Sequence, residues 1–298
     1  FISDLVVYLT CVITIIYVVR VGLCVQIMAE QFKNKVVIVT GSSSGIGEAI
    51  AISFASQGAN VTLCGRDQDR LKSALDKVVK ASGGHQDRFF TVQGDLNDNI
   101  IRKQIVDQTV DKFGRLDVLV ANAGVTGPKQ TVETADDESY NKTFDTNLKS
   151  VFFLIQQAVP HLEKSKGNIV NISSNVTSFV YSFATIYSMA KIALDHLTRC
   201  LAVDLGSKGI RVNSINPGYV QTNIGRDVDD SVAKFGIQLL ELDMEKRPLK
   251  ERSLTVEDIA KVVLFIASDA AGFITGERIN VDAGRSFGGP IDTFFLKL

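Results

Sequence analysis

Short apolar runs alternate with longer amphipathic stretches along most of this chain, and this alternation constrains its fold more than any other feature. The apolar runs are rich in β-branched residues and predict strands at residues 36–40, 60–64, 88–92, 116–121, 167–172, 211–216 and 278–281. The stretches between them predict helices at residues 46–56, 68–81, 99–113, 137–162, 187–205 and 256–268. Strands that alternate with helices form a parallel sheet whose two faces the helices cover. The sequence therefore predicts an α/β fold, a doubly wound parallel sheet of about seven strands with helices on both faces.

The composition is that of a globular protein and excludes several classes of function. The chain has 298 residues, of which 45% are hydrophobic, and 32 Lys plus Arg nearly balance 33 Asp plus Glu. This balance leaves no basic excess for binding the phosphates of a nucleic acid. The cysteines are too scattered for a disulfide framework or a zinc site, and the histidines lie far apart. These residues are Cys11, Cys24, Cys64, Cys200, His85, His161 and His196. We expect a reduced, cytoplasmic protein without a metal site.

Residues 1–27 differ from the rest of the chain. The stretch 5–29 is apolar apart from Arg20 and is long enough to cross a bilayer. A charge at the centre of such a span costs about 2.5 to 3.5 kcal/mol. The first methionine is Met28, and the segment after it leads directly into the first predicted strand. Two interpretations remain open: residues 1–27 are a membrane anchor, or they are upstream sequence before a single catalytic domain at residues 28–298.

A glycine-rich loop, TGSSSGIG at residues 40–47, joins the first predicted strand to the first predicted helix. In this context Gly41 permits a tight turn, Gly45 lets the backbone approach a pyrophosphate, and Gly47 allows close packing of the helix on the strand. The N-terminus of the helix attracts the negative charge of the phosphates. The loop therefore indicates a dinucleotide-binding sheet of the Rossmann type.

The end of the second predicted strand indicates which dinucleotide the chain binds. An acidic residue there would bind the ribose 2′-hydroxyl of NAD, whereas an arginine accommodates the 2′-phosphate of NADP. The chain reads LCGRD at residues 63–67, so no acid ends the strand and Arg66 follows it. Asp67 is expected to cap the next helix. Because Arg66 can pair with a phosphate through two nitrogens, NADP(H) is favoured over NAD(H).

Tyr187 and Lys191, in the segment YSMAK, are the strongest catalytic signal. Residues four apart share one face of a helix, so Lys191 is expected beneath Tyr187. A phenol with a pKa of about 10 is a poor base at neutral pH, but an adjacent ammonium lowers that pKa. The pair would then exchange a proton with an alcohol or a carbonyl.

Six motifs together resemble the short-chain dehydrogenase/reductase family. They are the glycine-rich loop, ANAG at residues 121–124, Asn147 in DTNLKS, Ser174, YSMAK at residues 187–191 and NPG at residues 216–218. The motifs follow the family's order and cover the chain from Lys35 to the C-terminus. One departure is Ala121, where the family commonly has a second asparagine, and a change in packing or in an adenosine-side contact is expected there.

The resemblance implies catalytic roles for four residues. Tyr187 would be the acid and base, and Lys191 would lower its pKa and bind the nicotinamide ribose. Ser174 would hold the substrate oxygen, and Asn147 would order a water relay to Lys191. Of the two neighbouring serines, Ser173 and Ser174, the spacing to the tyrosine selects the second.

The resemblance also implies a set of cofactor-binding residues. Asp95 would contact adenine, Asn122 would lie where the chain passes the adenosine ribose, and Thr222 would contact the carboxamide. For Asp95 and Thr222 the alternative is helix capping. The full set comprises Gly41, Ser43, Ser44, Gly45, Ile46, Gly47, Arg66, Asp95, Leu96, Asn122, Ala123, Gly124, Tyr187, Lys191, Pro217, Gly218 and Thr222.

Residues 222–253 break the alternation of strands and helices and predict a lid. Apolar side chains in this lid and in residues 175–186 favour an apolar alcohol or ketone as substrate, with packing against the domain or a second subunit as an equal alternative. These side chains are Val176, Phe179, Val180, Tyr181, Phe183, Ile224, Val228, Phe235, Ile237, Leu239, Leu240 and Met244. The resemblance further implies a homodimer or homotetramer formed through the helices at 137–162 and 187–205.

The resulting hypothesis is an NADP(H)-dependent oxidoreductase that transfers a hydride between nicotinamide and a carbonyl or secondary alcohol. The alternative is a non-catalytic, NADP(H)-binding regulatory protein, and the complete set of Asn147, Ser174, Tyr187 and Lys191 argues against it. An epimerase or dehydratase of the related extended families is also disfavoured, because only 80 residues follow Gly218.

Overall fold

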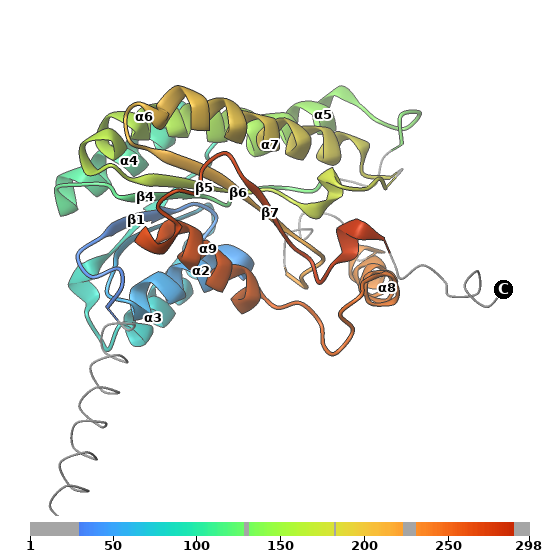
Figure 1. Ribbon diagram of the computed structural model, residues 1–298, viewed down its shortest axis with the longest axis horizontal. Helices are drawn as coiled ribbons and strands as arrows, with labels where there is room; N and C mark the ends of the chain where they lie inside the picture. The colour runs from blue at the N-terminus through green and yellow to red at the C-terminus, as the bar shows by residue number, and fades with distance from the viewer. Residues whose placement is uncertain (1–29, 128–130, 182, 223–230, 289–298) are drawn as a thin grey trace, which may run out of the picture.

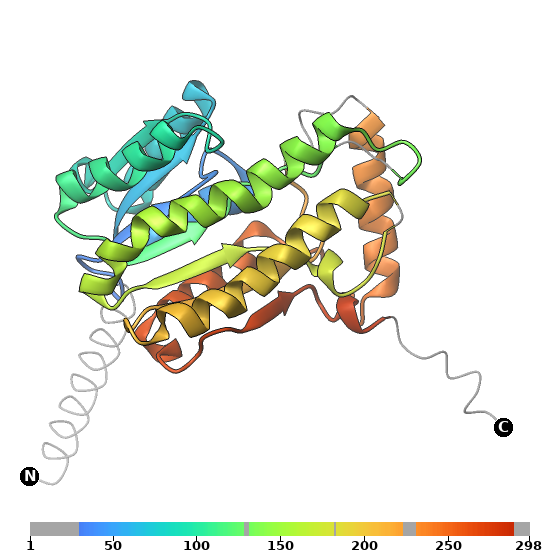
Figure 2. The same ribbon diagram turned by 90° about the horizontal axis from the view of Figure 1, so that it is seen from above.

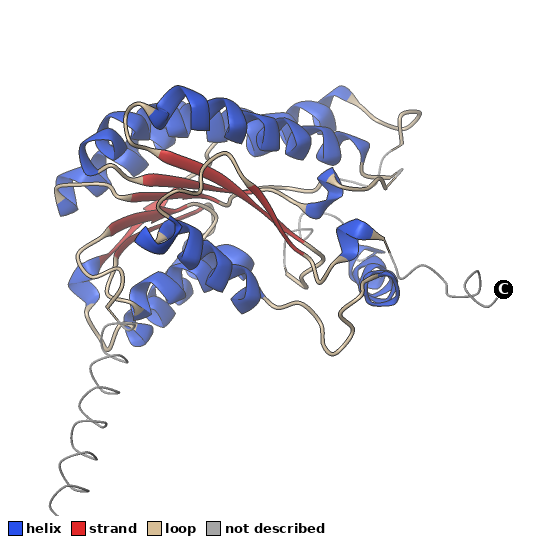
Figure 3. Cartoon of the chain, in the orientation of Figure 1, coloured by secondary structure: helices blue, strands red, loops and turns tan. Residues whose placement is uncertain are grey.

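A parallel sheet forms the centre of the molecule. The computed structural model describes residues 30–127, 131–181, 183–222 and 231–288, so the segment at residues 1–27 lies outside the described residues. Within the described residues, seven parallel strands are ordered β3-β2-β1-β4-β5-β6-β7 (Figures 1 and 3). They are β1 Val36–Val39, β2 Asn60–Gly65, β3 Phe89–Gln93, β4 Val118–Ala121, β5 Asn168–Ile172, β6 Arg211–Pro217 and β7 Arg278–Val281. The predicted doubly wound sheet is confirmed.

Helices cover both faces of this sheet (Figure 1). One layer contains α2 Gly45–Ser56, α3 Gln68–Ala81 and α9 Val256–Ala267, and the other contains α4 Asn99–Phe113, α6 Ser150–Ser165 and α7 Thr185–Gly206. Side chains alternate along each strand, so in β1 Val37 and Val39 pack toward the first layer while Val36 and Ile38 pack toward the second. Because both faces are covered, all four residues of β1 are buried, which explains the unbroken apolar run in the sequence.

The predicted helix at residues 137–162 is present, but one of its turns is not α-helical. Its two parts, α5 Asp137–Phe144 and α6 Ser150–Ser165, are joined by a π-helical turn, η2 Asp145–Lys149. In this turn the Asn147 side-chain Nδ2 donates to the Val125 carbonyl, and its Oδ1 accepts from the Val125 backbone nitrogen, both at 2.8 Å. A hydrophobic pattern does not reveal one widened turn, but such turns are frequent at functional sites.

The other predicted elements begin and end within two residues of the observed bounds. The predicted lid at residues 222–253 contains α8 Ser231–Lys246, while its residues 223–230 lie outside the described part of the chain. Figure 2 shows α8 at the end of the molecule toward which the strand arrows point. No helix among the residues that the structure describes combines the length and the apolar character needed to cross a bilayer.

The order of the strands locates the site. Strands β2 and β3 lie on one side of β1, and β4, the next strand along the chain, lies on its other side. In open sheets of this kind, ligands bind in the crevice outside the carboxyl ends of the strands, where the winding reverses. The loops that follow β1 and β4 therefore frame the candidate site, together with those after β5 and β6.

Candidate functional site

The glycine-rich loop follows β1 at this crevice. Gly41 and Gly45 have φ values of +63° and +61°, in the left-handed region that favours glycine. Gly47 lies against other parts of the site: a Cβ there would be 2.4 Å from Asn122 Nδ2 and 2.5 Å from the Gly41 carbonyl oxygen. The loop thus has the conformation that a tight turn and close packing of α2 require.

We expect Gly47→Ala to destabilise the protein, because its methyl group would overlap the Asn122 amide and the Gly41 carbonyl. Overpacking of this kind typically costs about 1 to 3 kcal/mol. The matched control is Gly206→Ala in α7, where an added Cβ would meet nothing within 4 Å. Thermal unfolding measures both effects, and a Gly47→Ala variant that unfolds at the wild-type temperature would contradict this packing.

Asn122, directly after β4, holds the glycine-rich loop in place. Its Nδ2 donates to the Thr40 carbonyl at 2.8 Å, and the backbone nitrogens of Asn122 and Ala123 donate to Thr40 Oγ1 at 3.0 and 3.1 Å. The Asn122 amide therefore holds the glycine-rich loop, and its expected place beside the adenosine ribose stays a prediction. Ala121 is buried in the core, and the expected change in packing or in an adenosine-side contact stays a prediction.

The carboxyl ends of β2 and β3 bring Arg66 and Asp95 together. Arg66 NH1 lies 3.9 Å from Asp95 Oδ2, and each side chain is nearly half exposed. Asp95 Oδ1 accepts from the Asn97 backbone nitrogen at 2.9 Å, but the residue that caps α4 is Asp98, so the helix-capping alternative for Asp95 is wrong. Asp67 caps α3 as predicted, since it accepts from the Arg70 backbone nitrogen at 2.9 Å.

The loop after β6 lies close to the glycine-rich loop. Pro217 is the last residue of β6, and the Gly218 nitrogen donates to the Val281 carbonyl at 2.9 Å. Thr222 lies against Gly45, because a Cβ at Gly45 would be 3.2 Å from Thr222 Cβ. The remaining predicted cofactor residues lie in or beside the loops at the ends of β1, β3 and β4: Ser43 and Leu96 are buried, and Ser44, Ile46, Ala123 and Gly124 are partly exposed.

Asn147, Ser174, Tyr187 and Lys191 converge from three parts of the chain. Lys191, on α7, is 3% exposed, and its Nζ lies 5.8 Å from the centroid of the Tyr187 ring. The Ser174 hydroxyl, directly beyond β5, is hydrogen-bonded to Tyr187. Gly124 lies between Asn147 and Lys191, since a Cβ at Gly124 would be 3.0 Å from Asn147 Oδ1 and 3.5 Å from Lys191 Nζ. The structure therefore gathers all four predicted residues at one place.

Burial controls the protonation of the pair on α7. It raises the pKa of Tyr187 to about 12, although the hydrogen bond with Ser174 opposes the shift. Burial also lowers the pKa of Lys191 to about 8, against the attraction of Asp195. The pKa of Tyr187 is therefore raised and not lowered as expected, because burial dominates, and the Lys191 ammonium donates to the Ile172 carbonyl at 2.9 Å. At neutral pH the pair is a neutral phenol beside an ammonium.

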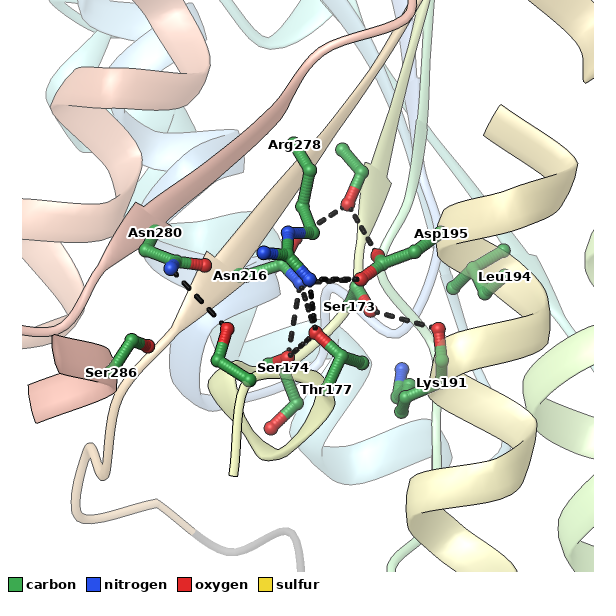
Figure 4. Close-up of polar contacts among 12 residues, drawn as sticks. Ser173, Ser174, Thr177, Lys191, Leu194, Asp195, Asn216, Arg278, Asn280 and Ser286 are labelled. Atoms are coloured by element: carbon green, nitrogen blue, oxygen red, sulfur yellow. Dashed lines mark hydrogen bonds and ion pairs between the residues drawn. The ribbon is translucent and has the colours of Figure 1, made fainter. Parts of the chain in front are cut away.

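The two neighbouring serines have different surroundings (Figure 4). Ser173 is bound to the backbone, since its hydroxyl donates to the Lys191 carbonyl at 3.3 Å and its nitrogen donates to the Ile215 carbonyl at 2.8 Å. Ser174 Oγ accepts from the Val176 nitrogen at 3.3 Å and also reaches Tyr187. The geometry favours Ser174, as the spacing in the sequence did.

The expected substrate wall is only partly apolar. Phe179 and Tyr181 form an edge-to-face pair at 5.1 Å, and Tyr181 stacks on Phe183 at 5.0 Å. The Arg285 guanidinium lies 4.3 Å from the centroid of Phe179, a contact that the sequence did not predict. Val176 is buried, and Val180 is 87% exposed. Ile224, Val228 and the side chains of Phe235 and Ile237 lie outside what the structure describes.

Comparison with known proteins identifies the family. A family model described as Enoyl-(Acyl carrier protein) reductase matches residues 41–286. An uncharacterized oxidoreductase of Thermotoga maritima is 39% identical over 86% of this chain and 99% of its own length. The meso-2,3-butanediol dehydrogenase of Serratia marcescens is 36% identical over 86% of this chain and 96% of its own.

The solved structures agree with the sequence relatives. A short-chain dehydrogenase/reductase of unknown function from Caenorhabditis elegans, solved with cofactor, superposes with a TM-score of 0.80. The two chains are 36% identical, and the match covers 86% of this chain and 97% of the Caenorhabditis elegans chain. The chain is thus an oxidoreductase that uses a nicotinamide cofactor and acts on alcohol or carbonyl groups. On its sequence, its fold and these relatives, it belongs to the short-chain dehydrogenase/reductase family.

Proposed function

We propose that this protein transfers a hydride between NADP(H) and a carbonyl or secondary alcohol at the site formed by Asn147, Ser174, Tyr187 and Lys191. The observation that carries the proposal is the convergence of these side chains, in which the Tyr187 phenol meets the Ser174 hydroxyl and faces the Lys191 ammonium. A phenol that is protonated at neutral pH suits an acid that delivers a proton to a carbonyl oxygen.

The residues present fit a nicotinamide dinucleotide. The N-terminus of α2 and the left-handed turns at Gly41 and Gly45 face the crevice, which favours a pyrophosphate there. Arg66 and Asp95 lie at the ends of β2 and β3, on the adenosine side of such a ligand, and the four candidate catalytic residues lie beyond β4 and β5. When bound, the nicotinamide ring supplies or accepts the hydride.

Crowding at the end of β2 supports NADP(H) over NAD(H). A Cβ at Gly65 would lie 2.9 Å from Ser43 Oγ and 3.0 Å from Ser43 Cβ, so an acidic side chain there would require Ser43 to move. A carboxylate at the position that binds the 2′-hydroxyl of NAD in related folds would therefore crowd Ser43. Arg66 follows directly and can pair with a 2′-phosphate through two nitrogens.

Each side chain has a chemical task in carbonyl reduction. The Ser174 hydroxyl and the Tyr187 phenol hold the carbonyl oxygen between them, and Tyr187 Oη donates its proton to that oxygen. The Lys191 ammonium stabilises the phenolate left behind. Asn147 holds the loop beside Lys191 through its two bonds to Val125 and orders the water that returns a proton.

The surroundings support further parts of the proposal. The proposal also takes residues 28–298 as the catalytic domain and residues 222–253 as a lid over the site. Phe179, Tyr181 and Phe183 favour a substrate with an apolar part. Exposed apolar side chains on α6 and α7 favour a homodimer or homotetramer through these helices. They include Phe152, Phe153, Met189 and Ile192.

A screen of ketones with each coenzyme tests the proposal. We expect turnover with NADPH, and less with NADH, for some member of a series that runs from small and polar (acetoin) to large and apolar (a 3-oxosteroid). The assay measures NADPH absorbance with the full chain and with a chain that begins at Met28. Binding of NADPH without turnover of any ketone would favour the regulatory alternative. Loss of folding in the shorter chain would show that residues 1–27 are needed.

A further inference from the structure

Asp195 shares a helix face with the two candidate catalytic residues of α7. It lies one turn beyond Lys191 and two turns beyond Tyr187, because residues four apart fall on one face. Its side chain is 11% exposed. Asp195 Oδ1 accepts from the Ser214 hydroxyl and Oδ2 accepts from Asn216 Nδ2, both at 2.8 Å (Figure 4).

Asn216 connects this carboxylate to the loop that carries Ser174. Asn216 is fully buried on β6, and its Nδ2 also donates to the Ser174 carbonyl and to Thr177 Oγ1, each at 3.0 Å. An amide has two N–H donors, and the Asp195 carboxylate, as the charged acceptor, fixes how they point. Asn216, the asparagine of the NPG segment, thus links Asp195 to the Ser174 loop, a role that the sequence motif did not reveal.

Charged groups near Asp195 come from two elements. On α7 it is preceded by Lys191, whose pKa it raises against the effect of burial. On β7, Arg278 NH1 lies 3.9 Å from Asp195 Oδ2. The groups that bond to the carboxylate from β6, Ser214 and Asn216, are uncharged. So are the Ile172 carbonyl on β5, which accepts from Lys191, and Asn147 on the π-helical turn, which lies across Gly124 from Lys191.

We propose that Asp195 is a positioning residue that acts on both ends of the site: its charge stabilises the Lys191 ammonium, and through Asn216 its carboxylate orients the Ser174 loop. A buried ammonium needs a nearby negative charge to remain protonated, and Asp195 supplies it. The inference rests on the proposed function for its consequence in catalysis. Its electrostatic part concerns Lys191 alone and is measurable without substrate.

The first experiment titrates Lys191 by NMR in full-length protein labelled with carbon-13 at lysine Cε, with the Lys191 signal assigned by its loss in Lys191→Met. Loss of an opposite charge nearby destabilises the ammonium, so Asp195→Asn lowers the pH at which Lys191 titrates, by about one unit. The matched control is Asp204→Asn, the same change at an exposed position of α7, which leaves the titration unchanged. An unchanged midpoint in Asp195→Asn would overturn the proposal.

A second variant is expected to shift the titration of Lys191 in the opposite direction. Arg278 is 38% exposed, so Arg278→Gln is expected to fold, and it removes the cation that offsets Asp195. The titration of Lys191 then moves to higher pH, and a move to lower pH would contradict the proposal even if Asp195→Asn failed to fold.

Kinetics separates positioning from a merely structural role. With a ketone that the wild type reduces, the alkaline limb of kcat should move to lower pH in Asp195→Asn, because Lys191 loses its proton earlier. A purely structural role would lower kcat by one factor at every pH. If no ketone is turned over by the wild type, the proposed function fails, while the NMR titration still decides the inference.

Discussion

Replacing Tyr187 by phenylalanine is expected to lower kcat for carbonyl reduction by about 10²- to 10⁴-fold, the usual contribution of a positioned general acid. The variant loses the proton donor but keeps the ring that packs beside Lys191. Affinity for NADPH should stay within a few-fold of wild type, because the phenol acts on the substrate oxygen and not on the phosphates. Steady-state kinetics and a fluorescence titration with NADPH measure the two quantities.

Tyr140→Phe is the matched control, since it removes a hydroxyl from an exposed tyrosine on α5 and should leave kcat unchanged. The direction of the reaction adds a second check. Reduction needs the Lys191 ammonium and the Tyr187 phenol, so it declines as pH rises through the pKa of Lys191 and then through that of Tyr187. Oxidation needs the phenolate, which forms as pH rises through the pKa of Tyr187. Retention of most activity in Tyr187→Phe would mean that another group is the acid.

Arg66→Ala is expected to weaken NADPH binding by about 1.5 to 3 kcal/mol, the range for a hydrogen bond to a charged group. NADH lacks the 2′-phosphate and should bind nearly as before. Because about 1.4 kcal/mol corresponds to a factor of ten, the preference for NADPH should drop by roughly 10- to 150-fold. The dissociation constants of both coenzymes, measured by fluorescence or calorimetry, give this ratio.

Arg70→Ala is the control for charge at this end of the site. Arg70 pairs with Asp67 at 2.7 Å in the first turn of α3, so its loss removes the same charge nearby and should not change the ratio. An equal loss of affinity for both coenzymes in Arg66→Ala would mean that Arg66 only supports its loop. A wild-type preference for NADH would contradict the assignment outright.

Most of the fold follows from local patterns in the sequence. The buried strands appear as β-branched runs because helices cover both faces of the sheet. The bounds predicted for β7 also coincide with the observed ones, although this edge strand is not buried. The π-helical turn at Asn147 was not predictable from periodicity. It depends on two hydrogen bonds to Val125, which lies in a different loop.

The sequence predicted which residues form the candidate site but not the direction in which the pKa of Tyr187 moves. Motif spacing located Ser174, Tyr187 and Lys191, but the pKa of Tyr187 is raised and not lowered, because burial outweighs the hydrogen bond with Ser174. Thr40 and Asp195 were missed. For Asp195 a signal existed, since it continues the spacing of four residues from Tyr187 and Lys191 along one helix face.

In the proposed reaction this chain moves a hydride from NADPH to a carbonyl carbon while Tyr187 protonates the oxygen. The most direct test supplies NADPH that carries deuterium at both C4 positions, together with a ketone that the wild type reduces, and locates the label in the alcohol by mass spectrometry. We predict one deuterium on the former carbonyl carbon with the wild type, and almost no labelled alcohol with Tyr187→Phe under the same conditions. An alcohol that carries hydrogen from solvent at that carbon, or equal amounts of labelled alcohol from both proteins, would contradict the account.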